Sequence, residues 1–417
     1  MSAKTLKPKK EVRPEGKQTE PFNFTADMIG SEILERFSKD IYNPKSIIRE
    51  LVSNAYDSYA QLEEHLAEIG EDLEISREVR VDVADKAVIV TDEGLGMNRD
   101  DIYKLVSIAL TDKRDMSGVR GYRGIGFWSA YTGGEQVVVE TTKFGENRKI
   151  WLTLNTQKMR ERQTPSTSIA SIMNDPECVF LESEPAAAEE HGTKVIIIAE
   201  TTEGRLHALV NDPEQMRSVL EQGCACRLPP GDSESVPGSI YKNAEAFSKE
   251  IGLKLPILKF QGAELLKTYP GKLENFTTEV IDVEIEGKRI ELAKLWYATN
   301  QENAQLEGPT AGIRIMRDGF PVGKPNIDSD RKIIGGTVEI TRQDLLFWHA
   351  GEVHLIHPEL RPDASGEGLP ESFIYSCFRE KLRGVYEKLI ERSRVKQLTK
   401  SLRSDYKKDW FIRLCSG

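Results

Sequence analysis

The stretch RELVSNAYDS, residues 49–58, places three polar side chains in a segment that is otherwise largely apolar. Glu50, Asn54 and Asp57 are four and three residues apart, so in a helix they share one face. A helix is predicted here because a proline stands in its first turn, near residue 44. Taken alone, such a triplet is also typical of a solvated helix face, and the surrounding sequence has to decide between the two interpretations.

Thirty-four residues after the end of this stretch, DEGLGM (92–97) follows an apolar, β-patterned run. Asp92 ends that run, where its carboxylate can accept a hydrogen bond from the exocyclic amine of adenine. Gly94 and Gly96 would let the backbone pass close to the base, since glycine has no Cβ. The segment therefore predicts a binding position that selects adenine over guanine.

Glycines also precede a predicted helix in GYRGIGFWSA (121–130). The free amides and the positive dipole end of such a helix suit phosphate oxygens, which makes Gly121, Gly124 and Gly126 candidate phosphate contacts, although this glycine spacing alone is weakly specific. Asn54 offers a hard oxygen ligand for a Mg²⁺ ion that bridges the phosphates. Glu50, one turn earlier, can orient and deprotonate an attacking water.

The segments ELVSNAYDS, DEGLGM, GYRGIGFWSA and HGTK (191–194) resemble, in order and spacing, the four motifs of the GHKL superfamily. This superfamily includes DNA gyrase B, the ninety-kilodalton heat-shock chaperone, histidine kinases and MutL. The resemblance is strong over residues 22–200 and is nearest to the chaperone. It implies a Bergerat-type α/β sandwich that binds ATP with Mg²⁺ and hydrolyses ATP slowly. It also implies further nucleotide contacts at Asp57, Met97, Ile125, Phe127 and Thr193.

A weaker resemblance covers the second half of the chain, where AGIRIMRDGF and GEVHLIHPELRPDASGEGLPES are similar to the chaperone's middle domain. It implies a ribosomal-S5-like α+β domain. The phosphate-contacting arginine of that domain is matched here by Gly366, which departs from the family pattern. Arg361 and Lys324 are the alternative sources of the missing cation.

The segment ALTDKRD resembles the Thr/Ser-x-Lys element of MutL and the microrchidia ATPases, which makes Thr111 and Lys113 candidate phosphate contacts. A solvated, charged loop is an equally compatible interpretation. Loops at this place in the superfamily close over ATP and create a dimerisation surface. An ATP-dependent homodimer is therefore implied by the resemblance.

The domain organisation is predicted from changes in composition and pattern along the chain. Helices and antiparallel strands occur in an order that predicts an α+β sandwich with the helices on one face of the sheet. Its first hairpin, VRVDVAD followed by KAVIVTD, turns at an Asp-Lys pair, and residues 155–191 are expected to be loop-rich. The predicted divisions are a flexible basic arm (1–21), an ATP-binding domain (22–205), a transducer domain (206–370) and a C-terminal helical segment (371–417) whose helix runs from about residue 370 to 400.

Net charge and cysteine content limit the partners. The 417 residues carry 57 basic and 67 acidic side chains, a net charge of -10 that opposes binding to nucleic acid or anionic membranes. The C-terminal helix is locally basic, so a DNA-handling ATPase of the MutL or microrchidia type remains an alternative, as does a nucleotide-gated interaction module with little hydrolysis. Five cysteines and the lack of a long apolar segment predict a soluble, cytoplasmic protein that does not bind membranes. The sequence does not identify a protein client.

Overall fold

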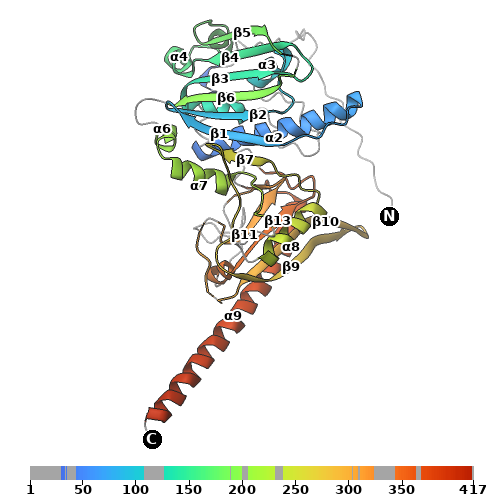
Figure 1. Ribbon diagram of the computed structural model, residues 1–417, viewed down its shortest axis with the longest axis vertical. Helices are drawn as coiled ribbons and strands as arrows, with labels where there is room; N and C mark the ends of the chain where they lie inside the picture. Colours follow the sequence, from blue (N-terminus) through green and yellow to red (C-terminus); the bar gives the residue numbers. More distant parts are fainter. Residues whose placement is uncertain are drawn as a thin grey trace, which may run out of the picture.

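The chain folds around two β-sheets, one above the other in Figure 1, and a long helix extends from the second sheet. The predicted arm at residues 1–21 lies outside the residues that the structure describes. This computed structural model describes residues 30–32, 34, 44–107, 126–187, 189–199, 205–230, 238–302, 304–308, 310–323, 343–362 and 368–415.

The first sheet has the strand order β5-β4-β3-β6-β2-β1-β7-β8. All of its neighbouring strands are antiparallel except β1 and β7, which are parallel. The predicted Asp-Lys turn between β1 and β2 is confirmed, with φ angles of 48° at Asp85 and 66° at Lys86. The strands are β1 (Glu78–Ala84), β2 (Ala87–Asp92), β3 (Gly134–Thr142), β4 (Arg148–Leu154), β5 (Val179–Pro185), β6 (Gly192–Ala199), β7 (Ile257–Phe260) and β8 (Ala263–Glu264).

Helices cover one face of this sheet. The longest of them, α2, lies across β1, β2 and β6 and buries Val52 and Tyr59 in the core. Buried and half-buried residues alternate along β1, as expected for a strand with one face against helices. The helices of this part are α2 (Pro44–Ile69), α3 (Arg99–Val106), the 3-10 helix η2 (Gly126–Thr132), α4 (Thr156–Arg162), α5 (Ile169–Met173), α6 (Arg205–Val210) and α7 (Pro213–Gly223).

The prediction of a loop-rich segment at residues 155–191 is wrong, because α4, α5 and β5 lie there. Both helices begin at side-chain caps. Asn155 Oδ1 accepts the Lys158 N–H at 3.0 Å, and Ser168 Oγ accepts the Ser171 N–H at 3.2 Å. These caps were the sequence signal for helix starts, but the helices are too short for their apolar period to be recognised.

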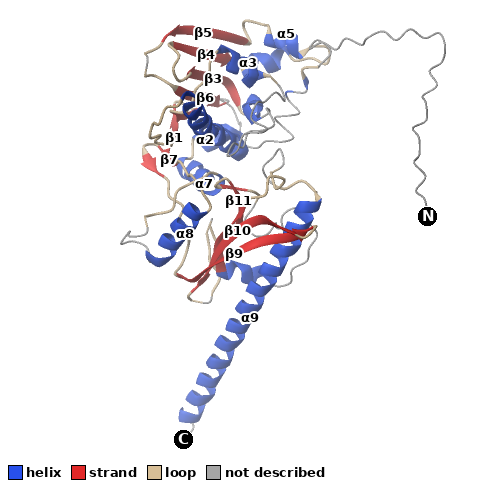
Figure 2. Ribbon diagram, turned by 90° about the vertical axis from the view of Figure 1, so that its right-hand side faces the viewer, coloured by secondary structure: helices blue, strands red, loops and turns tan. Residues whose placement is uncertain are grey.

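The second sheet has the order β12-β11-β13-β10-β9 and is mixed, with β11 parallel to β13 and the other pairs antiparallel. One face packs against α9 (Phe373–Cys415) and the 3-10 helix η3 (Gln343–Trp348), and the other packs against α8 (Gly238–Glu250). Figure 2 shows both arrangements. The strands are β9 (Leu273–Ile285), β10 (Lys288–Asn300), β11 (Gly312–Arg317), β12 (Phe320–Pro321) and β13 (His349–Leu355).

Helix α9 is longer than predicted and runs well beyond residue 400. No proline or glycine occurs between Gly384 and the end of this helix, so nothing in the sequence interrupts it. Its first half packs on the sheet, and its second half extends away from the domain in Figure 2. Within the described ranges, no helix combines the length and the apolar character needed to cross a bilayer.

The predicted fold class is confirmed as an α/β sandwich followed by a second α+β unit and a C-terminal helix. The S5-like character of the second unit stays a prediction. The predicted boundary at residue 205 also stays a prediction. In the structure, β7 and β8, from beyond that residue, complete the edge of the first sheet.

Candidate functional site

Helix α2 carries the three polar residues that were predicted to share a face. Glu50 and Asn54 are half-buried, and Asp57 has no solvent exposure. A buried carboxylate is retained only where hydrogen bonds or opposite charges satisfy it. The burial of Asp57 therefore excludes a fully solvated face, whereas a site made of all three residues stays a prediction.

The loop after β2 is held against α2 at Ser58, the residue next to Asp57. Asp92, only 6% exposed, accepts the N–H of Gly94 on its Oδ1 at 2.9 Å. The N–H of Leu95 donates to the carbonyl oxygen of Ser58 at 3.1 Å. A Cβ at position 94 would overlap the side chain and backbone of Ser58. Glycine at this position therefore allows Asp92 to lie beside the polar face of α2.

Two further glycines are required by close backbone contacts. Gly96 has a φ of +67°, and a Cβ there would overlap the carbonyl oxygen of Thr142. Gly192 has a φ of +110°, and its Cβ would overlap the carbonyl oxygen of Asp92. These φ angles also disfavour any residue with a side chain. The glycines of the second and fourth motifs thus bring three strand ends together at one edge of the site.

Two threonines connect these strand ends. Thr193 stands opposite Asp92 across β2 and β6, and opposite Thr141 across β3 and β6. Thr141 Oγ1 accepts the N–H of Met97 at 2.9 Å, donates to the carbonyl oxygen of Gly192 at 2.9 Å, and lies 3.0 Å from Thr193 Oγ1. Sequence reasoning missed Thr141; its signal was a polar residue at the end of the apolar run VVVETT.

The segment GYRGIGFWSA (121–130) includes the start of η2, whose residues pack on α2. Phe127 and Trp128 are buried, and the Trp128 and Tyr131 rings pack edge to face with centroids 6.3 Å apart. Gly126 begins this 3-10 helix. The other candidate phosphate contacts lie outside the described residues: Thr111, Lys113, Gly121, Gly124 and Ile125.

A protein-family comparison matches the region that contains this site. Residues 42–193 match the family model of the histidine kinase-, DNA gyrase B- and HSP90-like ATPases. This region is a GHKL ATPase domain. The match includes the helix face of α2, the loop after β2 and the start of β6, which are the three parts that the structure brings together.

Curated relatives of the GHKL domain are heat-shock chaperones. The chaperone HtpG of Helicobacter hepaticus is 31% identical over 136 residues, which cover 28% of this chain and 22% of that protein. The chloroplastic heat shock protein 90-5 of Arabidopsis thaliana is 31% identical over 153 residues, 32% of this chain and 19% of that protein. HtpG of Wolbachia pipientis is 28% identical over 192 residues, which cover 40% of this chain and 30% of that protein. The chain thus spans less than a third of the length of these relatives.

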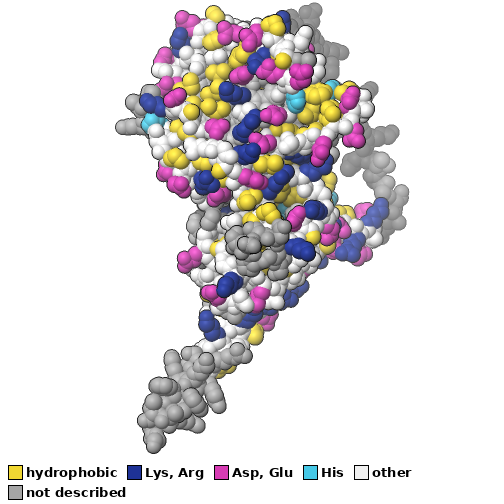
Figure 3. All heavy atoms as spheres, in the orientation of Figure 1, with side chains coloured by type: hydrophobic (Ala, Val, Ile, Leu, Met, Phe, Trp, Pro, Cys, Tyr) yellow, Lys and Arg dark blue, Asp and Glu magenta, His cyan; other side chains and the backbone are white. Residues whose placement is uncertain are grey.

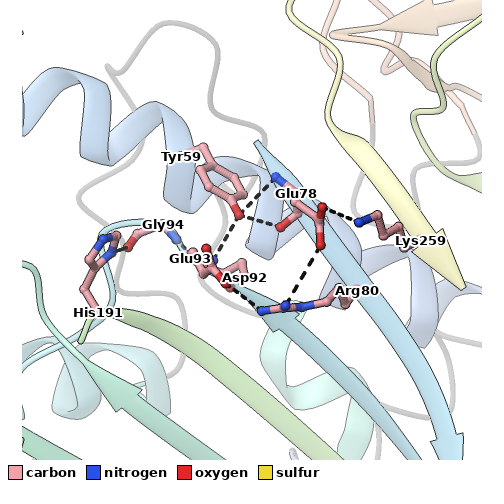
Figure 4. Close-up of polar contacts among 8 residues, drawn as sticks. All are labelled: Tyr59, Glu78, Arg80, Asp92, Glu93, Gly94, His191 and Lys259. Atoms are coloured by element: carbon pink, nitrogen blue, oxygen red, sulfur yellow. Dashed lines mark hydrogen bonds and ion pairs between the residues drawn. The ribbon is translucent and has the colours of Figure 1, made fainter. Parts of the chain in front are cut away.

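The GHKL domain contains a second cluster that sequence reasoning missed, shown in Figure 4. Tyr59, two residues after Asp57 on α2, accepts the N–H of Glu93 at 3.0 Å and of Glu78 at 3.2 Å, and donates to the Glu78 carbonyl oxygen. Burial raises the pKa of this phenol, so it stays protonated. The hydroxyl therefore fixes the backbone of the loop immediately after Asp92.

Ion pairs continue from this loop to the neighbouring strands. Arg80 lies 2.7 Å from the carboxylate of Glu93, and Lys259 on β7 lies 2.7 Å from that of Glu78 (Figure 4). On the other side of the loop, His191 Nδ1 is 2.8 Å from the carbonyl oxygen of Gly94. The loop of the GHKL domain is thus held by contacts from α2, β1 and the start of β6.

The candidate cation of the second unit, Arg361, is half-buried and follows β13. Its role as the partner of a phosphate stays a prediction. The alternative Lys324 and the family position Gly366 lie outside the described residues.

Proposed function

We propose that the protein binds ATP with Mg²⁺ and hydrolyses it slowly, and that it works as a conformational switch like the heat-shock chaperones. The observation that carries this proposal is the contact of the Asp92 loop with α2 at Ser58, which places a buried carboxylate beside the face of Glu50 and Asn54. The sterically required glycines support it, because they permit the close backbone contacts that hold the Asp92 loop against its neighbours.

In this proposal Asp92 accepts the exocyclic amine of adenine. Its carboxylate is oriented by the Gly94 N–H, so the acceptor direction is fixed before the nucleotide binds. Met97 and Thr193 border the base, since Thr141 holds them together. Gly121, Gly124, Ile125, Gly126 and Phe127, with Thr111 and Lys113 from the preceding segment, would contact the ribose and phosphates.

The polar face of α2 would carry the chemistry. Asn54 has the side-chain oxygen that suits Mg²⁺, and Asp57, one turn later, supports the same end of the nucleotide. When bound, Mg²⁺ offsets the negative charge of the phosphates. Glu50 would orient the attacking water and remove its proton as the water oxygen bonds to the γ-phosphorus, while the bond to the β,γ-bridging oxygen breaks and ADP leaves. Arg361 is the candidate for the cation that contacts the γ-phosphate.

Contacts of α2 with the second half of the chain support a switch. The Tyr56 hydroxyl donates to the carbonyl oxygen of Lys254, and the Tyr56 ring meets Phe320 of β12 edge-on, with centroids 5.8 Å apart. Lys254 also pairs with Glu63 of α2 at 2.7 Å. A displacement of α2 caused by the nucleotide would therefore reach the second sheet. By the family resemblance, the ATP-bound state is a homodimer.

The experiment is ATP turnover of the full chain, with and without Mg²⁺, beside Glu50→Ala and a matched control, Glu64→Ala, which changes an exposed residue of the same helix. We expect Mg²⁺-dependent phosphate release that is lost in Glu50→Ala and retained in the control. Light scattering should show a dimer only with ATP. Hydrolysis at the wild-type rate by Glu50→Ala would overturn the proposed mechanism. ATP binding without phosphate release by the wild type would favour an interaction module.

A further inference from the structure

A polar groove lies between the second sheet and α9, away from the GHKL domain. Its volume is about 540 Å³, within the range of small-molecule sites. Residues of β9, β10 and β13 form one wall, and two turns of α9 form the other. Figure 2 shows α9 passing beside β9 and β10 before it leaves the domain.

The helix wall of the groove is basic. Lys388, Arg392 and Lys396 are spaced four residues apart, which places them on one face of α9, and all three line the groove. Among the described residues, Lys388 and Arg392 form no ion pair, and Lys396 lies 3.9 Å from Glu274. Glu391 is the acidic residue of this wall. The cations therefore outnumber the carboxylates that border the groove.

The sheet wall orients one of these cations. Arg392 donates to the Tyr297 hydroxyl at 3.1 Å, and that hydroxyl donates to Glu279 at 2.9 Å. A guanidinium has five N–H donors, and the bond to Tyr297 uses one of them. Asn275 and Thr277, also on this wall, add an amide and a hydroxyl group. The wall thus supplies neutral hydrogen-bonding groups opposite a row of positive charges.

The floor of the groove is rigid and uncharged. His349 lies between Thr299 and Ser393, with its Nδ1 3.0 Å from Thr299 Oγ1 and its Nε2 2.9 Å from Ser393 Oγ. Burial lowers the pKa of His349 to about 4, so the ring is neutral near pH 7. Because both ring nitrogens have partners, His349 joins β13 to α9 and keeps the two walls at a fixed separation.

We propose that this groove binds a small oligophosphate anion, with Lys388, Arg392 and Lys396 contacting successive phosphate groups. Neighbours four apart on a helix have Cβ atoms about 6 Å apart, and lysine and arginine side chains are long enough for their charged ends to converge on the linked phosphate groups of one anion. Linked phosphates offer more acceptor oxygens to several cations than a single carboxylate does. A compact anion is favoured over a nucleic acid strand, because Glu391 lines the groove, Glu274 pairs with Lys396, and the chain carries a net charge of -10. On the face seen in Figure 3, basic and acidic side chains are interspersed, so no basic track is visible there.

Calorimetric titration of the full chain with inorganic pyrophosphate tests this site. The test variant is Arg392→Gln with Lys396→Gln. The matched control is Lys381→Gln with Arg383→Gln, which removes the same charge from exposed positions of α9 outside the groove. We expect at least tenfold weaker pyrophosphate binding in the test variant and less than a twofold change in the control. Higher salt should weaken the wild-type binding.

Two results would overturn the site. One is pyrophosphate binding by the test variant at the wild-type affinity. The other is an equal loss in both variants, which would show a diffuse charge effect. A 20-nucleotide single-stranded DNA is titrated in the same way. If it binds more tightly than pyrophosphate and this binding is lost in the test variant, the groove binds nucleic acid and the small-anion proposal is wrong.

Thr277→Asp adds a carboxylate to the sheet wall without changing α9, and it should weaken pyrophosphate binding as strongly as the double substitution. This second variant keeps the test decisive if the double variant melts at a lower temperature. The proposal is independent of the ATPase, because Glu50→Ala should leave the groove intact.

Discussion

Asp92, at the end of a central strand of the first sheet, and Glu352, inside the second, are both buried carboxylates, exposed by 6% and 3%, but their surroundings differ. Asp92 ends a strand, and the backbone N–H of its own loop orients it. Glu352 is contacted by three side chains: Lys267 Nζ at 2.6 Å, the Tyr269 hydroxyl at 2.9 Å and His354 Nε2 at 2.9 Å.

The charged partners of Glu352 are a further difference between the two carboxylates. Burial alone would raise the pKa of Glu352, but Lys267 and His354 hold it well below its ordinary value. Such a group is ionised at neutral pH and saturated by protein donors, so it serves the fold. Asp92, in contrast, is placed by a loop that requires glycines and meets the polar face of α2. If Asp92 binds adenine as proposed, the surroundings of a buried carboxylate, more than its burial, distinguish a structural from a ligand-binding role.

The largest expected effect is on stability, from Lys267→Met. Removing one partner of a buried ion pair leaves an uncompensated charge and costs about 3 to 5 kcal/mol. Urea denaturation should show this loss in the free energy of unfolding, while ATP affinity of the folded protein stays within about twofold. Adding Glu352→Gln should restore part of the stability, because no buried charge is then left unpaired. A stability unchanged by Lys267→Met would remove the basis of the comparison.

The next effect is on binding, from Asp92→Asn. The asparagine Oδ1 can still accept the Gly94 N–H. Its NH2 group would then face the adenine amine, and because both groups are hydrogen-bond donors, no hydrogen bond forms between them. We expect about 100-fold weaker Mg·ATP binding, about 2.7 kcal/mol, by calorimetry. The free energy of unfolding should change by less than about 1 kcal/mol. Glu93→Gln, at the exposed neighbouring position, is the control and should bind ATP within about threefold of the wild type.

The third expected effect is a loss of stability at acidic pH, caused by the buried His349. Its pKa in the folded protein, about 4, is below the value of about 6.5 for an unfolded chain, so the unfolded state binds more protons between these values. Stability from this group is fully present above pH 6.5 and is lost as the pH falls toward 4. Between pH 6.5 and 5 the wild type should lose about 2 kcal/mol, and His349→Gln should lose correspondingly less. Parallel losses in both proteins would contradict the assignment.

The smallest expected effect is the loss of stability in Lys254→Met, which compares an exposed charge pair with the buried pair of Lys267. Lys254→Met also breaks a lysine–glutamate pair, but Lys254 is largely exposed, with 64% of its side chain accessible. Such pairs contribute less than about 1 kcal/mol. Urea denaturation should therefore give a change several times smaller than that of Lys267→Met. A comparable loss would show that the Lys254 contact with α2 carries more of the fold than its exposure indicates.

Local features of the sequence predicted much of the fold and the segments that meet at the candidate site. Alternating apolar residues predicted β1 and β2, because this signal depends on neighbouring residues. Gly94 and Gly96 were expected to bring the backbone close to a base, which stays a prediction; the close contacts that the structure shows are with Ser58 and Thr142. The pairing of β1 with β7 and the ion pair of Lys267 with Glu352, 85 residues apart, depend on tertiary packing and have no local signal. Tyr59 was missed for a similar reason, since its partners lie on β1 and in the Asp92 loop.

The parallel pairing of β7 with β1 affects how the protein can be divided for expression. A fragment ending at residue 205 would contain the whole family match but would lack β7. The backbone of Glu78–Val81, which now pairs with Ile257–Phe260, would then become an open sheet edge able to pair with other chains. A fragment that extends through β8, to residue 264, keeps this edge covered and is the shorter unit to choose for studies of the isolated ATPase domain.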